Sequence, residues 1–169
     1  ELLIVVAIIL IIAAIAIPNL MRAKMAANTS SAAASERTIV TGEIAYFAAF
    51  PTIGYTTTLV TLGSTIGAAC SPSSGTACLI DSNLANNGTP ANSGKSGYTF
   101  VETGSNNGSG AAAVNNQFIT SAAALALTTG TTAFCAVDDG VVRSEPSNIA
   151  ATTAVTVYAT CQGLNPLAN

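Results

Sequence analysis

Glu1 is the ionisable residue whose surroundings most need a chemical explanation. Its carboxylate precedes sixteen residues, Leu2 to Ile17, that have no polar side chain. A charge beside a segment suited to lipid is costly, and it is by default a functional site with a charged partner. Glu1 therefore either pairs with a cation or marks the interfacial end of a membrane anchor.

Catalytic chemistry has few candidates in this chain. It contains no histidine, which removes the commonest general base and a common metal ligand. Serine and threonine are abundant, but the nucleophile motifs GxSxG and SxxK are both missing. The sequence therefore indicates neither an enzyme nor a cofactor.

Four cysteines form an even set outside the apolar segment, with no CxxC pair to suggest zinc. They are Cys70, Cys78, Cys135 and Cys161. We interpret them as disulfides formed in an oxidising compartment. Three pairings are possible, and the sequence does not choose between them. We favour a short loop closed by Cys70 and Cys78, and a longer loop closed by Cys135 and Cys161.

Several polar residues have patterns that suit either a turn or a binding site. Asp138-Asp139-Gly140 lies between AFCAV and VVR, which favours a hairpin turn over a calcium site. Asp81 and Ser82 are expected to cap a short helical turn rather than to bind metal. Asn87-Gly88-Thr89 and Asn107-Gly108-Ser109 match the glycosylation acceptor pattern.

The composition limits the classes of partner. The net charge is −3, and the five basic residues are scattered along the chain. We therefore expect no direct binding to nucleic acid, which needs grouped lysine and arginine. A length of 169 residues suits one globular domain together with one extended element.

The elements that would position these residues begin with a long helix. We divide the chain into an apolar half-helix (1–24), an amphipathic half-helix (25–50) and a globular head (51–169). Pro18 should kink the helix near Ala14, and Pro51 should end it. Five side chains are expected to pack on the head: Met21, Met25, Val40, Ile44 and Phe47.

The head shows short strand-like runs between turn signals. These runs are Tyr98–Thr103, Gln117–Leu127, Thr132–Val137, Val141–Arg143 and Ala154–Thr160. We predict an α+β fold in which the long helix packs on an antiparallel sheet. The last run is expected to be a C-terminal strand held by a disulfide.

The N-terminal residues ELLIVVAII and AAIAIPN resemble the first segment of type IV pilins and the related pseudopilins. The resemblance implies the type IV pilin fold, and four further apolar residues before Glu1 that begin with an N-methylated phenylalanine. It also implies a basic leader removed by prepilin peptidase. Glu1 would pair with the N-terminal amine of a neighbouring subunit. KSGYTFVETG and FCAVDDGVVR are similar to the sheet region of pilin heads.

Leu10 departs from the family pattern, because many members have glycine at this position. Family filaments often show an unwound stretch before the proline that matches Pro18. Leucine favours helix by about 1 kcal/mol over glycine. We therefore expect any unwound stretch here to be shorter or to start later.

The resemblance implies a structural subunit, the major pilin, that polymerises with identical chains into an extracellular type IV pilus. Before assembly it would be a single-pass protein of the cytoplasmic membrane, handled by prepilin peptidase and the pilus assembly machinery. Such filaments serve adhesion, twitching motility, biofilm formation or DNA uptake. The alternatives are a pseudopilin of a type II secretion system and a membrane-anchored binding domain that does not polymerise.

Overall fold

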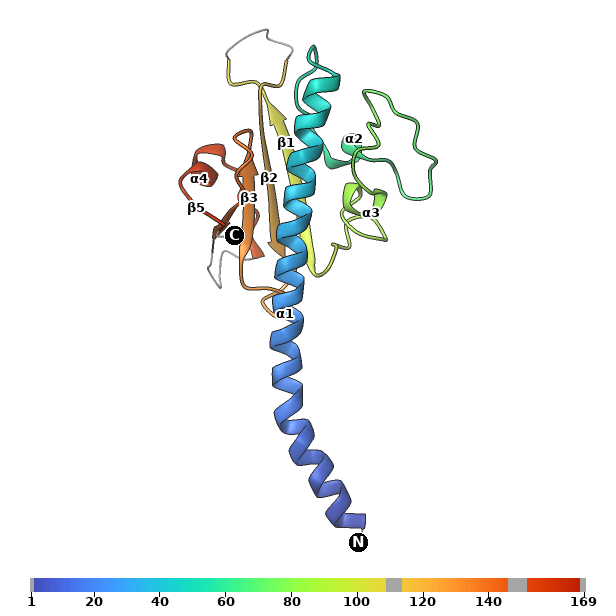
Figure 1. Ribbon diagram of the computed structural model, residues 1–169, viewed down its shortest axis with the longest axis vertical. Coiled ribbons are helices and arrows are strands. Elements are labelled where there is room, and N and C mark those ends of the chain that lie inside the picture. The colour runs from blue at the N-terminus through green and yellow to red at the C-terminus, as the bar shows by residue number, and fades with distance from the viewer. Residues whose placement is uncertain (1, 109–113, 146–151, 168–169) are drawn as a thin grey trace.

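One helix forms the long axis of the molecule (Figure 1). The computed structural model describes residues 2–108, 114–145 and 152–167. Helix α1 extends from Leu2 to Ala49; its C-terminal half lies along the head, and its N-terminal half projects away from it. The helix ends where predicted, because Pro51 disfavours helical geometry at the residue before it.

Helix α1 continues through Pro18. Its N-terminal part, dark blue in Figure 1, is inclined to the rest of the helix. A proline inside a helix removes one hydrogen-bond donor and clashes with the preceding turn, which bends the helix without necessarily breaking it. From Leu2 to Ala49 the helix contains no unwound stretch, at Leu10 or elsewhere.

The head is built on a five-stranded sheet with the order β1-β2-β3-β4-β5, in which all neighbouring strands are antiparallel. The strands are β1 (Tyr98–Ser105), β2 (Gln117–Ala124), β3 (Ala133–Val137), β4 (Arg143–Glu145) and β5 (Asn165–Pro166). Asp138 to Gly140 form the turn between β3 and β4, as predicted. The long helix and the antiparallel sheet confirm the α+β fold.

The central strands are buried on both faces. On the α1 side, Phe118 and Phe134 join the helix in the larger core. On the opposite side, Ile119 and Val137 pack with residues of the C-terminal segment. This burial explains why β2 and β3 consist largely of apolar and small residues instead of alternating with polar ones.

The strand predicted at Ala154–Thr160 is wrong, because the segment enters a short helix, α4 (Tyr158–Gln162). Local sequence favours a strand there, since Val155, Thr156 and Val157 are β-branched. The free edge of β4 is occupied instead by β5, which pairs with Arg143 and Ser144. The segment from Ala154 to Thr160 lies instead on the face of the sheet opposite α1, where Val155 is buried beside Ile119 and Val137.

The predicted packing face of α1 is only partly right. Met21 and Ile44 are about half exposed. Met21 precedes the first helix residues that form hydrogen bonds to the head, whereas Ile44 lines an open pocket beside Val142 and Leu167. The buried face carries Ala32, Ala33, Ser35, Glu36, Ile39, Val40, Gly42, Glu43 and Tyr46.

Two short helices cover the remaining side of α1 and β1. They are α2 (Leu59–Leu62) and α3 (Ser82–Ala85). Their buried leucines, Leu62 and Leu84, belong to the core formed with α1. The carboxylate of Asp81 accepts a hydrogen bond of 2.9 Å from the backbone N–H of Leu84, so Asp81 caps α3 as predicted.

Candidate assembly surface and the C-terminal hairpin

The N-terminal half of α1 presents apolar side chains that the described part of the head leaves exposed. Leu3 is 82% exposed and Leu10 63% exposed, although fully burying such a side chain gives roughly 1.5–3 kcal/mol. Contiguous exposed apolar surface of this kind marks an interaction with protein or lipid. Glu1, the expected charged end of this surface, lies outside the described residues.

By length and composition, α1 is apolar enough to cross a membrane. Core helices and signal sequences can share these properties, but the apolar window of α1 is entirely unburied. This window belongs to the projecting half, whereas the half on the head carries buried polar residues. The projecting half is compatible with a membrane anchor.

The helix meets the head just after two exposed cations, Arg22 and Lys24. The amide Nδ2 of Asn28 donates to the carbonyl of Thr129 at 3.0 Å. The hydroxyl of Thr29 lies 3.2 Å from that of Tyr98. These contacts mark the start of the docked half, close to the expected boundary between residues 24 and 25.

Both disulfides have the pairing that we favoured from the spacing. Cys70 joins Cys78 in an exposed loop, and Cys135 of β3 joins Cys161 of α4. The second bond is completely buried and fixes α4 against the face of the sheet opposite α1. The two disulfides therefore have different structural roles, one within a loop and the other between layers.

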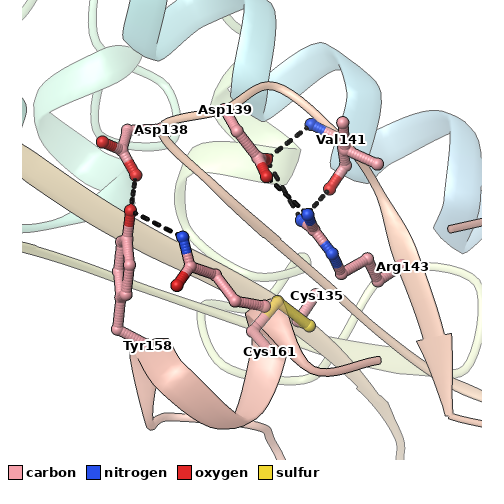
Figure 2. A network of polar contacts seen from close by, with 8 residues as sticks. Cys135, Asp138, Asp139, Val141, Arg143, Tyr158 and Cys161 are labelled. Carbon is pink, nitrogen blue, oxygen red and sulfur yellow. Dashed lines mark hydrogen bonds and ion pairs between the residues drawn. A yellow bond between two sulfur atoms is a disulfide. The ribbon is translucent and has the colours of Figure 1, made fainter. Parts of the chain in front are cut away.

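The turn after β3 has a set of polar contacts, shown in Figure 2. The hydroxyl of Tyr158 donates to the carboxylate of Asp138. Asp139 accepts from the backbone N–H of Val141 at 2.9 Å and from Nη1 of Arg143 at 3.1 Å. The guanidinium of Arg143 lowers the pKa of Asp139, whereas burial and then Asp138 raise the pKa of Tyr158 to about 12.

These contacts assign both aspartates to the structure of the hairpin. Asp139 neutralises Arg143, and Asp138 holds Tyr158 at the start of α4. Across residues 2–108, 114–145 and 152–167, no group of three or more cysteine, aspartate or glutamate side chains is arranged to hold a metal ion. The hydrogen bond between Asp138 and Tyr158 thus connects the turn after β3 to α4. The sequence analysis did not anticipate this hydrogen bond.

The two asparagines of the glycosylation patterns differ in their surroundings. Asn87 is half-buried, and its Oδ1 accepts a hydrogen bond of 2.8 Å from the backbone N–H of Phe100. Asn107 is exposed, and its Oδ1 accepts from Nδ2 of Asn116 at 2.6 Å. Glycosylation at either residue stays a prediction.

The sequence analysis missed a group of buried carboxyls between α1 and the sheet. Glu36 and Glu43 are fully buried, and Glu102 of β1 is 6% exposed. The spacing of seven residues places both helix glutamates on one face. That spacing was a signal in the sequence, because the same face also carries Ile39 and Tyr46.

Comparisons with protein-family models, with curated proteins and with solved structures give no match for this chain. The long apolar helix, the antiparallel sheet and the disulfides are compatible with a pilin-like fold. The resemblance to type IV pilins therefore stays a prediction from the N-terminal segment and the two stretches of the head.

Proposed function

We propose that this chain is a structural subunit, the major pilin, of an extracellular type IV pilus, and that it polymerises through the projecting half of α1. The supporting observation is that sixteen consecutive apolar residues form a helical surface that no described residue of the head buries. A bilayer before assembly and a bundle of identical helices afterwards would each cover this surface.

The geometry of the surface suits an open polymer. The projecting helix of one copy would contact a different surface of the next copy, such as its docked half or its head. A contact between two different surfaces is heterologous. Heterologous contacts that do not close into a ring generate helical filaments. Prepilin peptidase and an assembly machinery would be the further partners, with no direct contact to nucleic acid.

In this proposal Glu1 sets the register of assembly. Its carboxylate pairs with the N-terminal amine of a neighbouring copy, which neutralises two charges that are costly in an apolar bundle. Leu10 and Pro18 affect how far the helix can extend or bend within the bundle. Adhesion and twitching motility are the tasks to test first.

The decisive experiment is to shear filaments from the cell surface and to identify their repeating unit by mass spectrometry. We expect filaments composed of this chain. Chain that stays monomeric in the membrane fraction would support the non-polymerising anchor. A short periplasmic filament whose loss blocks protein secretion would support the pseudopilin of a type II secretion system.

The role of Glu1 is tested separately by Glu1→Ala, with Glu1→Asp as a variant that keeps the charge. Glu1→Ala should insert into the membrane normally but give far fewer filaments, whereas Glu1→Asp should retain part of the yield. Equal yields from both variants and the unmodified chain would rule out a role for this charge in assembly.

A further inference from the structure

Three carboxyl groups lie where the docked half of α1 meets the sheet. Glu36 and Glu43 are separated by two turns of α1, which is about 10.5 Å along the axis. Glu102 lies on the face of β1 that packs against the helix, and its Cα partner on β2 is Thr120. All three glutamates are buried, so any charge they carry is held away from water.

One threonine hydroxyl links two of these carboxyls. Oγ1 of Thr56 lies 2.5 Å from Oε1 of Glu43 and 2.5 Å from Oε1 of Glu102. The backbone N–H of Thr56 also donates to Oε2 of Glu43 at 3.0 Å. A hydroxyl has one hydrogen and can donate to only one carboxylate. The second short contact therefore needs a proton on one of the two carboxyls.

The remaining polar atoms of the cluster have no hydrogen-bond partner within the described residues. They are both carboxyl oxygens of Glu36, Oε2 of Glu102 and Oγ1 of Thr120. An ionised carboxylate left without a partner in such a site costs several kcal/mol, whereas the protonated acid is much less costly. Geometry alone therefore favours the neutral form of Glu36.

No cation faces the cluster from the elements packed against it, as far as the structure describes them. Lys95 pairs with Asp81 at 3.5 Å and donates to Ser35, the neighbour of Glu36. Arg143 pairs with Asp139. The other ionisable groups near the carboxyls are two tyrosines, Tyr46 of α1 and Tyr55 of the following loop, and β2, β3, α2 and α3 contribute none.

The electrostatics agree with this geometry. Burial raises the pKa of Glu36 to about 8, and the nearby Thr120 hydroxyl offsets this shift only in part. Burial, followed by the proximity of Glu43, raises the pKa of Glu102 well above its usual value. The folded protein therefore holds protons that the unfolded chain releases above about pH 4.5.

We propose that the contact between α1 and the sheet depends on bound protons: protons held at Glu36 and Glu102, beside the carboxyl of Glu43, keep the docked half of α1 on β1 and β2. Alkaline surroundings remove these protons and place like charges between the two layers. The helix then loosens from the head while the rest of the sheet and the buried disulfide stay intact.

The sign of the pH dependence follows from the raised pKa values. The stabilising protonation is complete below the unfolded pKa and is lost as the pH rises through the folded pKa. For Glu36 alone, the unfolding equilibrium constant should rise about tenfold per pH unit between roughly pH 5 and 8. Glu102, whose pKa is also raised, adds to this slope.

The test measures urea unfolding of the full chain in neutral detergent micelles from pH 5 to pH 10. The unmodified chain should lose stability steadily with rising pH. Glu36→Gln removes the titrating group. The rise of its unfolding equilibrium constant with pH should therefore be smaller by about a factor of ten per pH unit. Glu145→Gln, at the half-buried end of β4, is the matched control and should keep the original slope. An unmodified profile that is flat from pH 5 to 9, or equal slopes for the unmodified chain and Glu36→Gln, would overturn the proposal.

Hydrogen exchange at pH 9 locates the effect. The proposal expects faster exchange at residues 36–46 and 98–104, with β3 unchanged; uniform acceleration across the head would contradict it.

A second experiment distinguishes protonation of the carboxyls from binding of a metal ion. The urea unfolding is repeated with 5 mM calcium chloride, a concentration on the order of the Kd of weak oxygen-ligand sites or above it. Restored alkaline stability in the unmodified chain, but not in Glu36→Gln, would identify a cation site and overturn the proton mechanism. No effect of calcium supports it.

Discussion

The two halves of α1 belong to one continuous helix but have opposite relations to their surroundings. From Leu2 to Ile17 the projecting half is apolar on every side, and within the described residues it is not buried by any other part of the chain. The docked half is buried along one face, yet that face contains two glutamates. Hydrophobicity along this helix therefore does not indicate where it packs within the chain. The most apolar part is the part that the described head does not cover.

The largest effect should come from placing a charge in the projecting half. Ile9→Lys introduces an ammonium group near the centre of the apolar segment, where a lysine costs about 2.5–3.5 kcal/mol in a bilayer. We expect loss of surface filaments, measured in the sheared fraction. The control Ala34→Lys adds the same charge at an exposed position of the docked half and should leave filament yield nearly unchanged. Normal filaments from Ile9→Lys would show that this surface is not used in assembly.

Apart from the Cys135–Cys161 disulfide and the packing of α1 on the sheet, the features that the sequence predicted correctly are local ones. The end of α1 follows from Pro51, and the turn at Asp138 to Gly140 follows from its residues. The carboxyl cluster depends on contacts between distant segments. Along β1, Tyr98, Phe100 and Glu102 alternate toward the core, so the pattern does place Glu102 inward. Local periodicity could not show that Thr56 and Glu43 would meet it there.

The error at Ala154–Thr160 has a similar origin. A β-branched run predicts a strand only where a sheet edge is open to receive it, and β5 occupies that edge. Cys161 fixes the segment on the other face of the sheet. The exposed Ile44 shows the converse: an apolar residue on a helix is not buried unless another element covers its side. At Ala154–Thr160 tertiary contacts override the local preference, whereas Ile44 stays half exposed because the described head covers it only in part.

The next largest effect should come from removing the disulfide on the face of the sheet opposite the docked half. In the chain-entropy model, Cys135→Ala with Cys161→Ala should lower the free energy of unfolding by about 3.5 kcal/mol, because the closed loop is long. Cys70→Ala with Cys78→Ala should cost about 2.5 kcal/mol by the same model. Urea unfolding of both double variants in micelles measures the difference. A larger loss from the exposed loop would contradict the assignment of structural roles.

Overpacking compares the two halves of the helix directly. Ala32 is completely buried under the head, whereas Ala14 is exposed in the projecting half. Ala32→Leu should destabilise the head by about 1–3 kcal/mol, because the core has no room for the added carbons. Ala14→Leu should leave the thermal midpoint of the head within error. Equal midpoints for the two variants would mean that α1 does not dock as described.

The smallest effect concerns the point where the two halves meet. Asn28→Ala removes the hydrogen bond to the carbonyl of Thr129, whose loss should cost about 1 kcal/mol. Hydrogen exchange should accelerate at residues 25–31 while the buried turn around Ile39 keeps its protection. Ser30→Ala, at an exposed position on the same turn, is the control for a change in helix propensity. If both variants accelerate exchange equally, the hydrogen bond of Asn28 does not fix the start of the docked half, and that start lies at Thr29 or beyond.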